Sequence, residues 1–132
     1  MIQAELTAFT AGYCEAMVWA NVAHNTETGD GPEAGFDELS EDVRRLMKID
    51  AALFAGTPRV AELLATATKR PAYGWEQAGH DYALTRNGHG VGFWDRGIEE
   101  GLELTMLAES VGGMYLYADE DAEPAEWTYA EA

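Results

Sequence analysis

The sequence predicts an α+β fold, in which helices pack on a small antiparallel β-sheet. Three observations lead to this class. Apolar residues recur at helical spacing through most of residues 2–70, a strand-like alternation surrounds an Asn-Gly pair, and a Met-Tyr-Leu-Tyr-Ala run follows a further helical segment. With 132 residues, 47% of them apolar, the chain is expected to form a single domain over residues 1–132.

The first predicted element is a helix over residues 2–23. Its apolar residues recur at three- and four-residue steps, which places them on one face. Cys14 belongs to this face, so we expect it to be a small core residue rather than a nucleophile. The face consists of Ile2, Leu6, Phe9, Tyr13, Met17 and Ala20, widened by Cys14, Val18 and Val22.

Two further helices are predicted to follow a loop at residues 24–35. The second helix begins at Asp37 or Ser40, since both residue types cap helix N-termini, and it ends at Gly56. The third helix takes Thr57 as its N-cap and Pro58 as its first residue. The expected buried stripe of the second helix is Leu39, Val43, Leu46, Ile49 and Leu53, with Arg44, Arg45 and Lys48 lying off it.

Residues 79–97 are predicted to form a β-hairpin about Asn87 and Gly88. A two-residue hairpin turn of the mirror-image type needs positive φ at both central positions, which Asn and Gly tolerate best. The resulting register places four cross-strand pairs on one face: Arg86 with His89, Leu84 with Val91, Tyr82 with Phe93, and His80 with Asp95.

The remainder of the chain is predicted to form a helix and a strand. Residues 98–111 have helical apolar spacing that ends at a Gly-Gly pair, and residues 114–118 form the strand. Residues 119–132 are expected to be an acidic tail, for which two alternatives stay open. Either part of the tail is mobile, or Trp127 to Tyr129 returns as a short edge strand.

The polar ends of the predicted hairpin hold the candidate catalytic residues His80, Asp95, Arg86 and His89. A carboxylate beside His80 would raise the basicity of its imidazole, and Arg86 with His89 would bind an anion. The two pairs lie at opposite ends of the hairpin, and no nucleophile is placed beside His80. We therefore expect these residues not to form a catalytic unit.

Two other roles compete for the polar side chains of the hairpin. His80, Asp81, His89 and Asp95 offer metal-ligand atoms, but their spacing is not HxH or HxxxH, so neither a metal nor another cofactor is expected. Alternatively, Asp81, Asp95 and Arg96 satisfy one another and buried backbone groups, which is the role that we favour.

The net charge of −16 is distributed unevenly. Residues 1–43 hold nine acids and no Lys or Arg, residues 97–132 hold ten acids and no Lys or Arg, and all eight Lys and Arg residues fall between them. This pattern argues against direct binding of nucleic acid, which requires clustered basic residues. It favours an acidic protein-binding surface, with simple solubility as the alternative. The expected partner-binding residues are Asp119, Glu120, Asp121 and Glu123.

The sequence also gives expectations for location. No run of 18 apolar residues is present, so no membrane-spanning helix is expected, and the N-terminus does not have the pattern of a signal peptide. A single cysteine excludes an internal disulfide and fits a reducing cytoplasm.

The segment AGHDYALTRNGHGVGFWDRG at residues 78–97 resembles a recurring block in small uncharacterised proteins of tailed bacteriophages and prophages, with a match that extends to about residue 121. The resemblance implies a phage origin and action in the cytoplasm of a bacterial host. We therefore expect a non-enzymatic accessory protein that binds a host or phage protein, including one that handles nucleic acid. A small enzyme or ligand-binding module that uses the hairpin at residues 79–97 is the alternative. The partner and the oligomeric state stay open.

Overall fold

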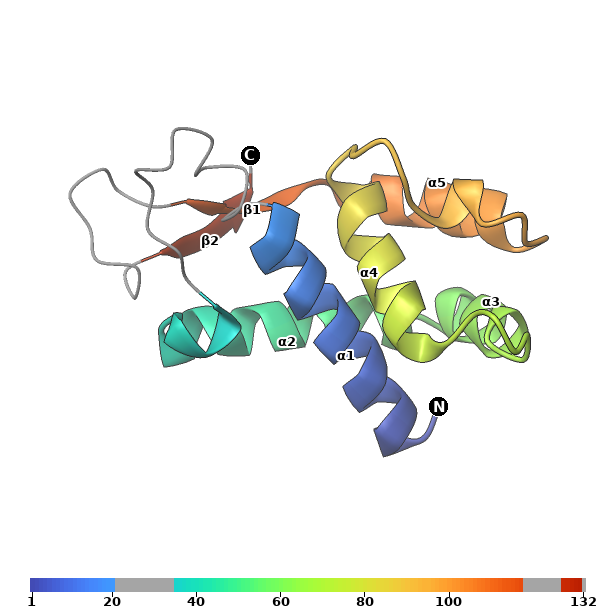
Figure 1. Ribbon diagram of the computed structural model, residues 1–132, viewed down its shortest axis with the longest axis horizontal. Coiled ribbons are helices and arrows are strands. Elements are labelled where there is room, and N and C mark those ends of the chain that lie inside the picture. The colour runs from blue at the N-terminus through green and yellow to red at the C-terminus, as the bar shows by residue number, and fades with distance from the viewer. Residues whose placement is uncertain (21–34, 118–126, 132) are drawn as a thin grey trace.

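The computed structural model describes residues 1–20, 35–117 and 127–131, and it confirms the α+β class. In Figure 1, α1 and α4 lie side by side at the centre, α2 crosses behind them, α3 and α5 lie at one end, and a two-stranded sheet lies at the other. The described elements are α1 (Gln3–Val18), η3 (Phe36–Glu38), α2 (Glu41–Gly56), α3 (Pro58–Ala67), α4 (Trp75–Arg86), η4 (Phe93–Asp95), α5 (Gly101–Val111), β1 (Met114–Tyr117) and β2 (Thr128–Glu131).

Helices α1 and α4 touch through glycine. A Cβ atom added at Gly79 would lie 1.9 Å from the carbonyl oxygen of Phe9, and one added at Gly12 would lie 2.0 Å from that of Glu76. These separations are far inside van der Waals contact. The two helices can therefore pack backbone to backbone only because both positions lack a side chain.

Aromatic rings fill the space on which α1, α2 and α4 converge. The rings of Phe54 and Tyr82 are stacked, with centroids 3.9 Å apart and planes 4° from parallel. Phe9 and Tyr13 stack on Tyr82 from α1, and Phe93 of η4 lies against Phe54. Residues from the first, middle and later parts of the chain thus form one core.

Local capping signals predict the starts of α2 and α3 correctly. Ser40 is the N-cap of α2, and its Oγ accepts a hydrogen bond from the Val43 amide at 3.2 Å, so the second of the two predicted starts is confirmed. Thr57 precedes Pro58 at the first position of α3, as predicted.

The predicted buried stripe of α2 is partly wrong. Leu46, Ile49 and Leu53 are 47%, 47% and 69% exposed, although Leu39 and Val43 are buried. The observed buried face is Val43, Met47, Ala51, Phe54 and Ala55. Both stripes are apolar and both have helical spacing, so the pattern alone does not decide which one faces the core.

The predicted hairpin over residues 79–97 is wrong, because residues up to Arg86 belong to α4. Gly88 has the expected positive φ of 71°, but Asn87 has φ −95°. The Gly88 amide donates to Thr85 O at 3.2 Å and the His89 amide donates to Leu84 O at 3.0 Å, the bonds of a Schellman helix end. The Asn-Gly pair therefore ends a helix, and none of the four predicted cross-strand pairs forms.

The sheet consists of β1 and β2, paired antiparallel with Leu116 opposite Tyr129. The predicted strand at 114–118 is confirmed over Met114–Tyr117, and residue 118 lies outside the described residues. The edge-strand alternative for Trp127 to Tyr129 is realised in β2. Trp127 and Tyr129 are buried, so this part of the predicted tail belongs to the core. Residues 119–126 of that tail lie outside the described residues. Among the residues that are described, no helix has the length and apolarity needed to cross a bilayer.

Candidate binding groove

Arg86, one of the four candidate catalytic residues, is built into the core. Its side chain is 3% exposed, its Nη1 donates to Asp50 Oδ2 and, at 3.0 Å, to Tyr13 Oη, and its Nε donates to Gly112 O at 2.8 Å. Tyr129 Oη also donates to Asp50 Oδ2. This cluster, which we call the Asp50 cluster, ties α1, α2, α4 and β2 together.

The phenols of the Asp50 cluster are neutral donors. Burial is the largest effect on Tyr13 and raises the pKa of its phenol above the usual value, against the opposing effect of Arg86. Burial likewise raises the pKa of Tyr129, and the hydroxyl of Tyr13 and the carboxylate of Asp50 add to the increase. Neither phenol is therefore poised to act as a base at neutral pH.

A second buried cluster joins Asp81 to Arg96. Asp81 is fully buried, and its carboxylate accepts a hydrogen bond from Arg96 Nη2 at 2.8 Å and another from Tyr73 Oη at 2.7 Å. Burial, followed by the charge of Asp81, raises the pKa of the Tyr73 phenol. The predicted pairing of Asp81 with Arg96 is thus confirmed, although it joins α4 to the segment after η4 rather than the two strands of a hairpin.

The structure separates the other candidate catalytic residues. His80 Nε2 faces Glu15 of α1 with 3.7 Å to its Oε2 atom, whereas Asp95 Oδ1 accepts a hydrogen bond from the Gly92 amide at 2.9 Å. The backbone of His89 closes the end of α4. These side chains do not converge on one point, and within the described ranges no three His, Cys, Asp or Glu side chains are grouped so that they could hold a metal.

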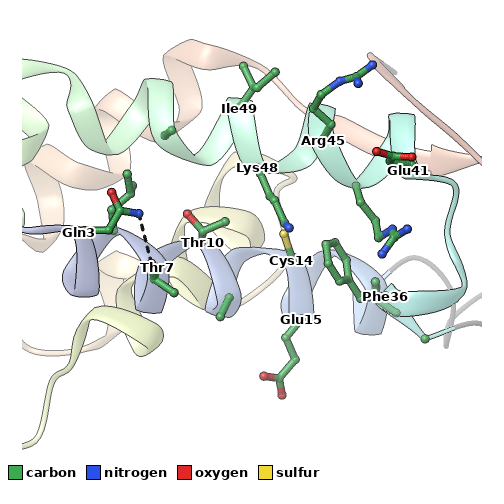
Figure 2. Close-up of a pocket in the computed structure, with 16 residues that line it drawn as sticks. Gln3, Thr7, Thr10, Cys14, Glu15, Phe36, Glu41, Arg45, Lys48 and Ile49 are labelled. Atoms are coloured by element: carbon green, nitrogen blue, oxygen red, sulfur yellow. Dashed lines mark hydrogen bonds between the residues drawn. The ribbon is translucent and has the colours of Figure 1, made fainter.

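An open groove lies between α1 and α2. Its volume is about 1130 Å³, and it extends from Gln3 and Leu6 at one end to Val18 and Phe36 at the other. Most of its surface is apolar, with Cys14 on the floor. Figure 2 shows the side chain of Lys48 reaching from α2 towards Cys14 on α1. We call this feature the α1–α2 groove.

Three of the eight basic residues gather on the α2 wall of the groove: Arg44, Arg45 and Lys48. Arg45 pairs with Asp42 one turn earlier at 2.7 Å, an exposed pair of little energetic weight. Lys48 lies over the ring of Phe36, with 5.8 Å between its Nζ and the ring centroid. Two exposed acids, Glu15 and Glu41, stand on the rim of the groove.

Arg44 and Lys48 differ from Arg45, the third base of the groove, in lacking a described carboxylate partner. Neither side chain forms an ion pair with a carboxylate of the described residues. The Nε atom of Arg44 is buried and has no hydrogen-bond acceptor there. Buried polar atoms normally have a partner, so this donor points to an interaction that the described residues do not supply.

Cys14 is a neutral thiol at the floor of the groove. It is 4% exposed, and burial raises the pKa of its thiol to about 12, against the opposing effect of the Lys48 charge. The expectation that Cys14 is a small buried residue is confirmed.

Sequence reasoning missed the groove. The sequence showed only that three bases, Arg44, Arg45 and Lys48, lie off an apolar stripe. Nothing in the residue spacing indicated that they would line a groove between α1 and α2. The predicted partner-binding residues Asp119, Glu120, Asp121 and Glu123 lie outside the described residues. No protein-family model, no curated protein and no solved structure matches the chain.

Proposed function

We propose that this chain is a non-enzymatic protein-binding module that holds a segment of its partner in the α1–α2 groove. The observation that carries the proposal is the groove itself: an open, mainly apolar hollow whose wall holds Arg44 and Lys48, which pair with no carboxylate of the described residues. Grooves of this composition bury apolar side chains of a ligand and fix its orientation through a few charges.

The geometry on which the competing proposal depended, that of an enzyme or ligand-binding module built on residues 79–97, does not form. It required His80, Asp95, Arg86 and His89 to share one face of a hairpin. Arg86 is instead held in the Asp50 cluster, and Asp95 caps η4. These residues stabilise the fold, which supports a binding role for the chain over a catalytic one.

The resemblance of residues 78–121 to small tailed-phage proteins supports a narrower form of the proposal. The chain is then an accessory protein of a phage, acting in the bacterial cytoplasm on a host or phage protein, including one that handles nucleic acid. The acidic residues Asp119, Glu120, Asp121 and Glu123 are proposed to add a long-range attraction to a basic surface of that partner.

The test is affinity capture from a bacterial host lysate with groove-filling variants. Ala11 is exposed and lines the groove, so Ala11→Trp fills the groove without entering the core. Ala4 is exposed on the same helix outside the groove and provides the matched control Ala4→Trp. We expect the wild type and Ala4→Trp to capture the same protein and Ala11→Trp to lose it.

The acidic surface is tested in the same experiment with a variant in which Asp119, Glu120, Asp121 and Glu123 are neutralised. If they attract the partner, capture weakens in this variant and with rising salt. Equal capture by Ala11→Trp and the wild type would show that the groove is not the docking site. A defined protein lost only with the neutralised variant would place the interface on the acidic segment.

A further inference from the structure

We infer, on the basis of the proposed function, that the partner segment in the α1–α2 groove is an acidic amphipathic α-helix of about three to four turns. The inference rests on the spacing of the residues that line the groove, its length, and the charges on its wall. It identifies the partner by its chemistry and conformation.

The groove follows two helices along most of their length. On α1 the lining residues include Gln3, Thr7, Thr10 and Cys14, which recur at helical spacing, and they continue to Val18. At about 1.5 Å per residue, the 15 steps from position 3 to position 18 span about 22 Å. The α2 wall, from position 41 to position 52, spans about 16 Å by the same rise.

These dimensions suit a helix better than a compact ligand. The volume of about 1130 Å³ is distributed along the seam between two helices rather than collected in one enclosed cavity. A third helix, about 10 Å across, packs into such a seam with side chains at positions i, i+3, i+4 and i+7. A length of about 16–22 Å corresponds to about 11–15 helical residues.

The charges specify an acidic helix. Arg44, Arg45 and Lys48 form a basic wall on a chain whose net charge is −16. Carboxylates on the flank of a docked helix would pair with the charged groups of this wall. A basic helix would instead bring like charge against these three bases.

The segments of this chain outside the described residues are poor candidates for the occupant. Residues 21–34 contain one large apolar side chain, that of Val22, and residues 118–126 contain none. Neither segment supplies an apolar stripe. A second copy offers α5, where Leu102 and Met106 are exposed near Glu99 and Glu109, and this occupant is one outcome of the test.

The experiment is a selection from a displayed library of random peptides of about 15 residues. The library is selected on the full wild-type chain and counter-selected on Ala11→Trp, with Ala4→Trp as the matched control. We expect the enriched peptides to be acidic, with apolar residues at i, i+3 or i+4, and i+7. Binding of a selected peptide should be about fivefold weaker for Lys48→Glu.

Lys69→Glu provides the charge control, because Lys69 is exposed and lies outside the groove. It should bind the selected peptide as tightly as the wild type. Enriched peptides that depend on the groove but are basic, or lack helical spacing, would overturn the acidic-helix inference and leave the proposed function standing. The absence of any groove-dependent peptide would overturn the inference, while lysate capture lost in Ala11→Trp would still support the function.

Two further outcomes would replace the inferred occupant. The first is displacement of a fluorescent fatty acid from the wild type but not from Ala11→Trp, in the absence of peptide binding, which would assign the groove to a small acidic amphiphile. The second is self-association, detected by light scattering and abolished both by Ala11→Trp and by Leu102→Glu, which would assign it to a second copy. Monomeric wild type that binds the acidic helical peptides supports the inference.

Discussion

Residues 79–97 and the wall of α2 use their basic residues in opposite ways. Arg86 and Arg96 lie in the stretch with the densest polar motif, and both are paired with carboxylates inside the fold: Arg86 with Asp50 of α2, and Arg96 with Asp81 of the same stretch. Arg44 and Lys48 lie on an ordinary helix and have no such partner among the described residues. The comparison teaches that polar side chains without partners inside the fold are better evidence for a binding site than a conspicuous sequence motif. The polar side chains of such a motif are often paired with one another or with the core.

The energetic consequences of the two arrangements differ. A buried carboxylate such as Asp81 is tolerated because Arg96 and Tyr73 replace its hydration. Removing one member of such a cluster leaves the others desolvated and unpaired. An exposed base such as Lys48, which lies over the ring of Phe36, can be removed at little cost to the fold.

The largest effect is expected where residues 79–97 meet α1. Gly79→Ala places a methyl group 1.9 Å from Phe9 O and should destabilise the protein by about 3 kcal/mol or more, because the two helix backbones must separate. Gly56→Ala is the control, since nothing lies within 4 Å of the added Cβ, and it should change stability by less than about 1 kcal/mol. Urea denaturation measures both, and equal midpoints would refute the α1–α4 packing.

Loss of the Asp81 carboxylate should have an effect of comparable size. Asp81→Ala leaves Arg96 and Tyr73 without their acceptor and should cost about 3–5 kcal/mol. The matched control is Asp42→Ala, which removes an exposed ion pair with Arg45 and should cost less than about 1 kcal/mol. Thermal melts at pH 7 compare the two variants. Similar losses would mean that the Asp81 cluster is not desolvated.

Alkaline pH should weaken the buried clusters. Burial raises the pKa of Tyr13, Tyr73, Tyr82 and Tyr129 in the folded state above the unfolded value of about 10. The unfolded chain therefore loses these protons first, and stability present below about pH 10 falls as the pH rises further. Each tyrosine lowers the free energy of unfolding by up to about 1.4 kcal/mol per pH unit, until it ionises in the folded state.

The measurement is the melting temperature between pH 8 and pH 11, together with phenolate absorbance. Phenolate should appear for these tyrosines as the protein unfolds, and Tyr129→Phe should make the loss of stability with pH less steep. A melting temperature that stays constant across this range would contradict burial of the phenols.

The smallest effect on stability is expected at the groove. Lys48→Ala removes one exposed cation from the ring of Phe36 and should change stability by less than about 1 kcal/mol, while weakening partner binding. Thermal denaturation and peptide binding, measured on the same preparation, test this separation. A large loss of stability in Lys48→Ala would mean that the groove wall, like the Asp81 cluster, stabilises the fold.

The sequence by itself determined the α+β class and those boundaries that depend on neighbouring residues. Ser40, whose side chain caps α2, and the Thr57-Pro58 pair, which marks the start of α3, act within one helical turn, so both helix starts could be predicted without knowledge of the fold. The glycine conformation at position 88 was also local, and its positive φ was predicted correctly. Whether that glycine turned a hairpin or ended a helix depended on distant contacts, so it could not be predicted from the neighbouring residues.

Tertiary structure decided the identity of α4. This helix is buried on nearly all sides, so polar and apolar residues do not separate into two faces along it. Gly79 is required by the approach of α1, and Arg86 finds its partners Tyr13 and Asp50 in segments far along the chain. Because these contacts involve most positions of α4, the sequence there shows no amphipathic helical pattern, and its alternation resembles that of a strand.

The groove was likewise decided by tertiary structure. The sequence contained Arg44 and Lys48 but gave no means to know whether a carboxylate would reach them, just as Leu46, Ile49 and Leu53 satisfied a helical period yet remained exposed. Periodicity fixes which side chains share a face of a helix. Only the packing of α1 against α2 fixes which face is covered and which is left open, because coverage depends on where a distant part of the chain lies in space.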